Sequence, residues 1–326
     1  MAPNDACHSE LGDNRSLRGC PMSRRLCDMG TAKIADQLST GELRPLGNRG
    51  LPSRHAGWPA AGYDEGAAIS TMPEESKPAP YIEFVEVSKA FGDNVVLDRV
   101  SFTVMPGETV CILGRSGVGK SVSLHHIMGF LKPDSGRVIV AGEDITDYRE
   151  DQLEHIRKKV TMVFQNGALF DSLTVGENVA FPLRETNELS EEQIFQIVDG
   201  LLQMVGVQHM RDLLPSDLST GMKRSVAIAR ALAARPECVL YDEPTTMVDP
   251  LMAQLLGDLI KRLKIQLNLT SIVVTHDMRL AKKLADRLVF LYEAKAIFFG
   301  TYAAMEKDQH PIIQEFLELD ELKIEA

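Results

Sequence analysis

The sequence lacks any long apolar run. None of its 326 residues lies in a stretch that approaches the roughly 18 consecutive apolar residues needed to cross a bilayer, so we expect no membrane-spanning segment. The apolar core of a secretory signal is also missing near the start. Cysteines number only five, and Cys111 and Cys238 lie in apolar runs typical of buried strands. The odd, scattered set excludes a disulfide framework and favours a reducing, cytoplasmic compartment.

Basic residues are outnumbered. The chain has 35 Lys and Arg against 46 Asp and Glu, which gives a net charge of −11. Because a surface that binds nucleic acid needs the opposite balance, we expect no nucleic-acid partner. Hydrophobic residues make up 44% of the chain, which is enough for the core of one large domain or two smaller ones.

Large apolar residues are scarce in residues 1–80, which are rich in Arg, Gly, Pro, Ser and Asp. Such a segment cannot bury enough surface to offset the entropy cost of ordering it, so we predict a disordered N-terminal extension. Residues 23–38 are compatible with a short amphipathic helix. The Cys and His residues of the extension match none of the spacings of zinc sites.

One stretch carries a specific motif. Residues 114–121, GRSGVGKS, fit G-x-x-x-x-G-K-[ST], and they lie between an apolar run typical of a strand and a stretch typical of a helix. Backbone N–H groups in such a loop turn toward an anion, and the positive end of the helix adds to the field. We therefore predict a nucleoside-triphosphate site in which Lys120 contacts the β- and γ-phosphates and Ser121 holds Mg²⁺. The predicted nucleotide-binding residues of the loop are Gly114, Arg115, Ser116, Gly117, Val118, Gly119, Lys120, Ser121 and Val122.

The segment before this loop predicts a small antiparallel sheet. Residues 81–91 alternate apolar and polar, a Gly92-Asp93-Asn94 turn follows, and a second apolar stretch runs to Val104. Phe91 ends the first run, where an aromatic ring can stack on a nucleotide base. A plain core position for Phe91 is an equal alternative.

Four polar elements follow the loop in order. Gln165 comes after one apolar run, LSTG at 218–221 leads into a helix, Asp242 and Glu243 end a second apolar run, and His276 ends a third. Together with the phosphate loop, this set resembles the ATP-binding cassette (ABC) ATPases of transporters, because few other phosphate-loop proteins have an LSGG-like sequence before the paired carboxylates.

The resemblance covers residues 81–305 and implies an α/β fold. Its parts are a P-loop NTPase core with a mainly parallel sheet flanked by helices, an antiparallel β subdomain, and an inserted α-helical subdomain at about residues 166–235. A helical tail is expected over residues 306–326. ATP and Mg²⁺ are the expected cofactors.

The paired carboxylates have different expected roles. Asp242, at the end of its strand, can bind Mg²⁺ together with Ser121. Glu243, one residue on, points elsewhere and can polarise the attacking water. The resemblance makes Glu243 the general base, with His276 touching the γ-phosphate and Gln165 touching Mg²⁺ and the water. With Lys120, these residues form the expected catalytic set.

The LSTG element points to a second copy of the chain. Ser219 and the N–H groups of Thr220 and Gly221 precede a helix and can form a second anion site. In the family, this site closes on the γ-phosphate held by another cassette, and Asp249 lies near the same interface. Because the chain has one phosphate loop and one LSTG element, complete sites require a head-to-tail pair.

Three positions depart from the usual family pattern. Thr220 replaces a glycine of LSGG, Met222 stands where Gln is commonest, and Met247-Val248 replaces Gly-Leu before Asp249. A β-branched Thr where the backbone should approach closely can loosen the second anion site, so we expect slower hydrolysis or greater dependence on the membrane partner.

The region between Gln165 and the LSTG element is expected to be helical. Ser190 with Gln193 forms a capping box for a helix whose apolar stripe is a core face. The stripe consists of Ile194, Ile197, Val198, Leu201, Leu202 and Val205. Residues 167–185 are instead interpreted as loop-rich and partly exposed, as suits a groove for a helix of a transmembrane subunit. The apolar residues of this stretch are Leu169, Phe170, Val179 and Phe181.

That stretch, the GM after LST, and the ending at 310–317 most closely resemble the ATPase subunit of Mla/Mce-type phospholipid transporters. The resemblance implies transmembrane permease subunits, a substrate-binding Mce-type protein, and a peripheral position on the cytoplasmic face of the inner membrane. The alternatives are the ATPase of an amino-acid or other small-solute importer, a soluble cassette protein outside transport, and a regulatory cassette without hydrolysis.

Overall fold

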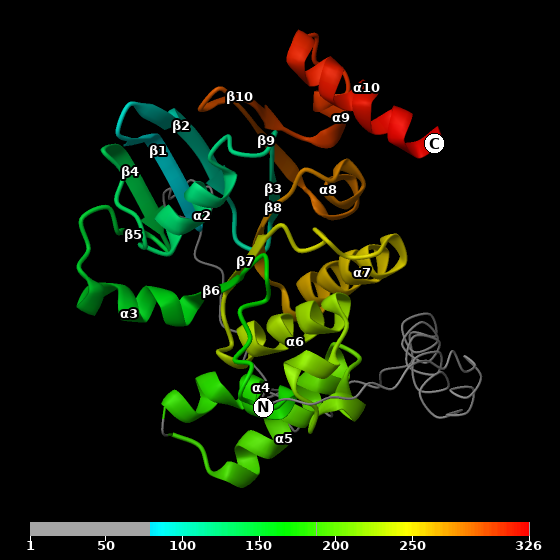
Figure 1. Cartoon of the computed structure of the whole chain (residues 1–326). Helices are drawn as coiled ribbons and strands as arrows, with labels where there is room; N and C mark the ends of the chain where they lie inside the picture. Colours follow the sequence, from blue (N-terminus) through cyan, green and yellow to red (C-terminus); the bar gives the residue numbers. More distant parts are fainter. Residues whose placement is uncertain (1–78, 187, 326) are drawn as a thin grey trace, which may run out of the picture. The chain divides into compact units, whose positions relative to one another are not determined.

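The computed structural model describes residues 79–186 and 188–325. The extension predicted for residues 1–80, with the helix considered for residues 23–38, lies outside the described residues apart from residues 79 and 80. The described part contains a six-stranded sheet, a four-stranded sheet and the helices around them (Figure 1).

The six-stranded sheet has the order β10-β9-β3-β8-β7-β6. Its strands are β3 (Thr109–Leu113), β6 (Val160–Val163), β7 (Cys238–Asp242), β8 (Thr270–Val274), β9 (Arg287–Tyr292) and β10 (Lys295–Gly300). All neighbours from β9 to β6 pair in parallel, whereas β9 and β10 form an antiparallel pair. The carboxyl ends of the parallel strands therefore share one edge, which is where open α/β sheets bind ligands.

Alternate residues of these strands face two different hydrophobic clusters. Cys111 of β3 and Val239 of β7 belong to one cluster with the helices after β6, whereas Val110 and Leu240 belong to the other with the smaller sheet. The thiols of Cys111 and Cys238 are free and fully buried, as the sequence predicts for core positions. The parallel sheet is therefore covered on both faces, as parallel sheets require.

The smaller sheet is antiparallel, with the order β2-β1-β4-β5. Its strands are β1 (Ile82–Phe91), β2 (Asn94–Val104), β4 (Ser135–Val140) and β5 (Glu143–Asp144). β1 and β2 pair from Phe91–Asn94 to Ile82–Val104, so the antiparallel pair predicted from the alternation is confirmed. The rings of Phe84 and Phe102 stack with centroids 4.5 Å apart and anchor the pair in the core.

The chain between β6 and β7 is mainly helical. It contains α4 (Val175–Glu185), α5 (Glu191–Met204), η1 (Gln208–Met210), η2 (Pro215–Asp217) and α6 (Thr220–Ala233). The capping box predicted at Ser190 and Gln193 is confirmed, and the predicted stripe of α5 packs into the core.

The loop-rich interpretation of residues 167–185 is wrong for its second half. Residues 175–185 form α4, because Thr174 and Glu177 make a capping box and Pro182 does not interrupt the helix. Val179 is fully buried on its inner face. Phe170 and Phe181 are partly exposed and lie against each other, with ring centroids 4.8 Å apart.

The remaining helices are α2 (Lys120–Ile127), α3 (Glu150–Lys159), α7 (Pro250–Leu267), α8 (Met278–Leu284), α9 (Tyr302–Met305) and α10 (Pro311–Glu325). α10 packs on the body of the protein, since Ile313 is fully buried and Phe316 meets Phe290 edge-on at 4.9 Å. Of the helices in the described ranges, none has both the length and the apolar character to cross a membrane.

Asn178 connects α4 to the loop after Gln165. Its side chain is fully buried, accepts a hydrogen bond from the N–H of Phe170 at 2.8 Å, and donates to the carbonyls of Phe170, Leu173 and Thr174 at 3.0 Å each. The conformation of this loop therefore depends on one buried amide.

We expect Asn178→Ala to lower the free energy of unfolding by about 2–3 kcal/mol, because buried polar groups lose their partners. Asn166→Ala is the matched control, since the exposed Asn166 makes a single bond to Ala168 at 3.0 Å. The control should cost less than about 1 kcal/mol. Urea unfolding followed by circular dichroism measures both, and equal losses would contradict this role of Asn178.

Candidate functional site

The phosphate loop connects β3 to α2, and at two of its positions the backbone accommodates only glycine easily. A Cβ at Gly114 would lie 2.5 Å from the carbonyl oxygen of Leu291, and one at Gly119 would lie 2.6 Å from that of Val96. Both glycines also have positive φ, 150° and 98°. α2 begins at Lys120 without a side-chain cap and has no acidic residue in its first turn. Its first N–H groups and its positive end are therefore available to an anion.

The ammonium group of Lys120 lies folded over this loop. Its Nζ donates to the carbonyl oxygens of Gly114 at 2.9 Å and Arg115 at 3.1 Å, and the residue is 6% exposed. The same Nζ lies 3.5 Å from Oε1 of Glu243. A buried cation at this point supplies charge where a triphosphate would otherwise be costly to bury.

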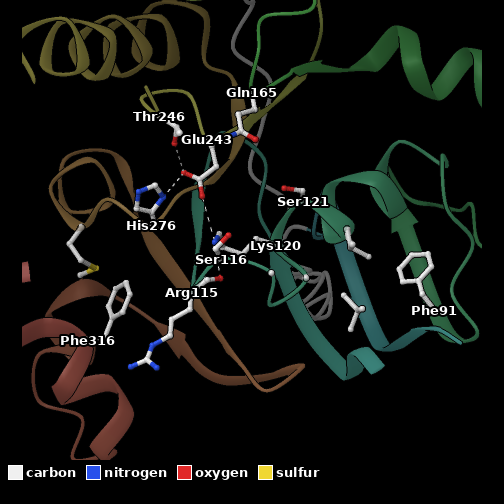
Figure 2. Close-up of a pocket in the computed structure, with 15 residues that line it drawn as sticks. Phe91, Arg115, Ser116, Lys120, Ser121, Gln165, Glu243, Thr246, His276 and Phe316 are labelled. Atoms are coloured by element: carbon white, nitrogen blue, oxygen red, sulfur yellow. Dashed lines mark hydrogen bonds and ion pairs between the residues drawn. The ribbon is translucent and has the colours of Figure 1, made fainter. Parts of the chain in front are cut away.

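A cavity of about 680 Å³ opens beside the loop (Figure 2). Its lining comes from elements far apart in sequence and includes Lys120, Gln165, Glu243 and His276. The volume lies in the usual range for small-molecule sites. The cavity thus brings together the phosphate loop and the polar ends of three strands.

Phe91 also lines this cavity. It is 48% exposed, so the core interpretation of this residue is wrong. The ammonium of Lys89 lies 5.6 Å from the centroid of its ring. Figure 2 shows Phe91 and Phe316 at opposite ends of the cavity.

The two carboxylates diverge, as the sequence predicts. Asp242 accepts a hydrogen bond from Oγ of Ser121 at 2.8 Å, and burial raises the pKa of Asp242. Glu243 has a positive φ of 46°, and its Oε2 lies 2.9 Å from Nδ1 of His276 and accepts a bond from Oγ1 of Thr246 at 3.0 Å.

The donors around Asp242 fit magnesium. In the described part of the chain, no three or more His, Cys, Asp and Glu residues are grouped so as to hold a metal ion. Mg²⁺ typically takes one or two carboxylates and completes its shell with phosphate and water. A buried carboxylate with a raised pKa beside the Ser121 hydroxyl suits that pattern, since a divalent cation would favour its ionised form.

The LSTG residues do not join this cavity in the same chain. Ser219 caps α6, where its Oγ accepts the Met222 N–H at 3.3 Å, and Thr220 is exposed beside it. Gly221 packs under Met252, and Asp249 caps α7 by accepting the N–H of Met252 at 3.0 Å. The described lining of the cavity includes none of Ser219, Thr220, Gly221 and Asp249.

Sequence reasoning missed four lining residues: Val96, Thr246, Met278 and Phe316. Thr246 could have been found from its position three residues after Glu243, because a turn brings residues at that spacing close together. Phe316 has no local signal, because α10 reaches the site through tertiary packing. Beside it, Arg115 of the phosphate loop pairs with Glu315 of α10 at 2.7 Å.

Comparisons with known proteins agree with this geometry. The ABC transporter family model matches residues 97–246. The intermembrane phospholipid transport system ATP-binding protein MlaF of Haemophilus influenzae is 39% identical over 236 residues, which are 72% of this chain and 89% of that protein. The probable ribonucleotide transport ATP-binding protein mkl of Mycobacterium tuberculosis is 34% identical over 236 residues, 72% of this chain and 66% of that protein.

A solved structure is similar as well. It is a dimeric ATP-binding cassette in a post-hydrolysis state, bound to ADP and inorganic phosphate, with a TM-score of 0.63 and 32% sequence identity. The match covers 68% of this chain and 98% of that one. The family match spans the phosphate loop, the LSTG element and the paired carboxylates. With a relative that is 39% identical over most of its own length, the chain belongs to the ABC transporter family, as an ATP-binding subunit that hydrolyses ATP.

Proposed function

We propose that this ATPase powers phospholipid movement across or between membranes as a subunit of an Mla/Mce-type transporter. The cargo is supported by the Haemophilus influenzae relative, whose name assigns it to intermembrane phospholipid transport. The observation that carries the ATPase chemistry is the convergence of Lys120, Glu243 and His276 on one cavity beside the phosphate loop.

Each residue expected at the site has a role that suits its position. Lys120 and the N–H groups at the start of α2 stabilise charge on the β- and γ-phosphates, which is the main requirement of phosphoryl transfer. Glu243 is the general base for the attacking water, and His276 contacts the γ-phosphate. Ser121, Asp242 and Gln165 hold magnesium, which offsets phosphate charge when bound, and Phe91 stacks on the base.

Pairing and membrane attachment complete the proposal. Two copies meet head to tail, so that Ser219, Thr220, Gly221 and Asp249 of one copy face the phosphate loop of the other. A transmembrane permease docks near the exposed rings of Phe170 and Phe181, at the cytoplasmic face of the inner membrane. An Mce-type protein hands over the lipid.

A small-solute importer is the second candidate, because the Mycobacterium tuberculosis relative is named for ribonucleotide transport. The test is to purify the chain with the multi-span membrane protein that accompanies it and to reconstitute the complex in liposomes. ATP-dependent transfer of a fluorescent phospholipid is expected. Uptake of a radiolabelled ribonucleotide without lipid transfer would refute the lipid assignment, and isolation without any membrane protein would favour a soluble cassette.

We expect Glu243→Gln to lower kcat for ATP hydrolysis by roughly two to four powers of ten, because the amide cannot accept the proton of water. Nucleotide affinity should stay near the wild-type value. Glu188→Gln, at an exposed position, is the matched control and should hydrolyse normally. Phosphate release and fluorescent-nucleotide titration provide the two readouts; a Glu243→Gln chain with wild-type turnover would refute the base assignment.

Ser219→Asp should abolish ATP-dependent pairing of chains while sparing nucleotide binding. Asp still caps α6, but its negative charge would face the γ-phosphate of the partner copy. Ser216→Asp, an equal charge change at an exposed position, should pair normally. Light scattering with MgATP, on chains that also carry Glu243→Gln, measures the mass of the particles and so detects pairing. If the Ser219→Asp chain pairs as well as the chain without it, the head-to-tail arrangement is contradicted.

Thr220→Gly should raise ATPase turnover by about threefold, equivalent to less than about 1 kcal/mol of transition-state stabilisation. The physical reason is that glycine lets the exposed start of α6 approach the partner's phosphate more closely. The nucleotide affinity of the unpaired chain is the internal control and should not change. A rate equal to or below wild type would count against this effect of Thr220.

A further inference from the structure

Glu243 is held in an unusual backbone conformation. Its φ of 46° lies in the left-handed region, which non-glycine residues rarely adopt. Its N–H donates to the carbonyl of Val274 at 2.9 Å, and its own carbonyl accepts the N–H of Thr246 at 3.2 Å. Backbone hydrogen bonds on both sides of Glu243 therefore hold this turn, and the positive φ sets the direction of its side chain.

The two oxygens of the Glu243 carboxylate have different surroundings. Oε2 accepts the hydrogen bond from Oγ1 of Thr246 at 3.0 Å and lies 2.9 Å from Nδ1 of His276. Oε1 lies 3.5 Å from Nζ of Lys120, on the side of the phosphate loop. Two contacts on Oε2 fix the plane of the carboxylate, and Oε1 remains the oxygen that faces the phosphate loop (Figure 2).

Thr246 is itself well placed to act as a fixed donor. Its branched side chain has few rotamers, and it is half-buried in the wall of the cavity. Its carbonyl oxygen accepts a hydrogen bond from Nη2 of Arg224 at 3.5 Å. Arg224 lies on α6 and is 4% exposed, and among the described residues its Nε has no hydrogen-bond partner.

We propose that Thr246 is a positioning residue for hydrolysis: its hydroxyl holds Oε2 of Glu243 so that Oε1 faces the attacking water. This rests on the proposed role of Glu243 as the base. If the carboxylate turns away from the attacking water, the turnover rate falls but nucleotide binding does not weaken, because positioning acts on the transition state. The Arg224 contact anchors Thr246 from the helix that begins at LSTG.

The test compares Thr246→Val, which keeps the shape and removes the hydroxyl, with Thr246→Ser, which keeps the hydroxyl. For valine we expect kcat about 10- to 100-fold lower. Its KM for ATP and its affinity for a fluorescent ATP analogue should stay within about twofold of wild type. Serine should restore kcat to within about threefold of wild type. Thr161→Val is the matched control, because the hydroxyl of the partly buried Thr161 has no partner in the described structure and its loss should change nothing.

A second comparison uses the Glu243→Gln background. If Thr246 acts through the base, adding Thr246→Val there should lower kcat no further, because residues that act as a unit are not additive. A valine variant with wild-type kcat, a serine variant as slow as valine, or an equal further loss in the Glu243→Gln background would each overturn the role of Thr246. Those results leave the base assignment standing, which fails only if Glu243→Gln itself turns over normally. Should valine prevent folding, Thr246→Ala permits the same comparisons.

Discussion

Three strands without an exposed residue determine where chemistry can occur in this chain. Every position of β3, β7 and β8 is buried, and these strands lie side by side in parallel. Such strands cannot carry a solvated polar side chain along their length, so polar groups collect where the strands end. Because the strands are parallel, their carboxyl ends meet at one edge, and the loops there place the phosphate-binding backbone, the two carboxylates and His276 within reach of each other.

The consecutive carboxylates show how little sequence separation is needed for different environments. Asp242 is the last residue of β7 and points to the Ser121 hydroxyl, whereas the positive φ of Glu243 turns the next side chain toward His276 and Lys120. Burial makes each of these charges depend on a partner. A phosphate oxygen bound at the loop would pair with Lys120 more strongly than Glu243 does at 3.5 Å. Nucleotide binding would therefore release Oε1 of Glu243 from Lys120.

Local features were predictable and tertiary ones were not. The phosphate loop, the capping box at Ser190 and the antiparallel pair of β1 and β2 depend on neighbouring residues, and each follows from a short pattern. α4 was missed because its glycine and proline resemble a loop, although Thr174 and Glu177 carry the signal of a capping box. The alternation of apolar and polar residues could not decide whether Phe91 is buried or exposed, because the last residue of a strand can be either, depending on what packs against it. Phe316 reaches the cavity only because α10 folds back on the body.

Two helices of the chain begin with N–H groups that are free to bind an anion. α2 begins at the phosphate loop with its first N–H groups free, and α6 begins at LSTG. There the Ser219 hydroxyl accepts a hydrogen bond from the N–H of Met222. Among the described residues, the N–H groups of Thr220 and Gly221 have no acceptor. The N-terminus of α6 does not line the cavity of its own chain, so in the head-to-tail pair proposed above it would serve the cavity of the other copy. In that proposed pair, a triphosphate bound at α2 of one copy would also lie against the N-terminus of α6 of the other, so the nucleotide would link the two copies. Hydrolysis would then weaken the proposed pair, because it removes the phosphate that both helix ends share.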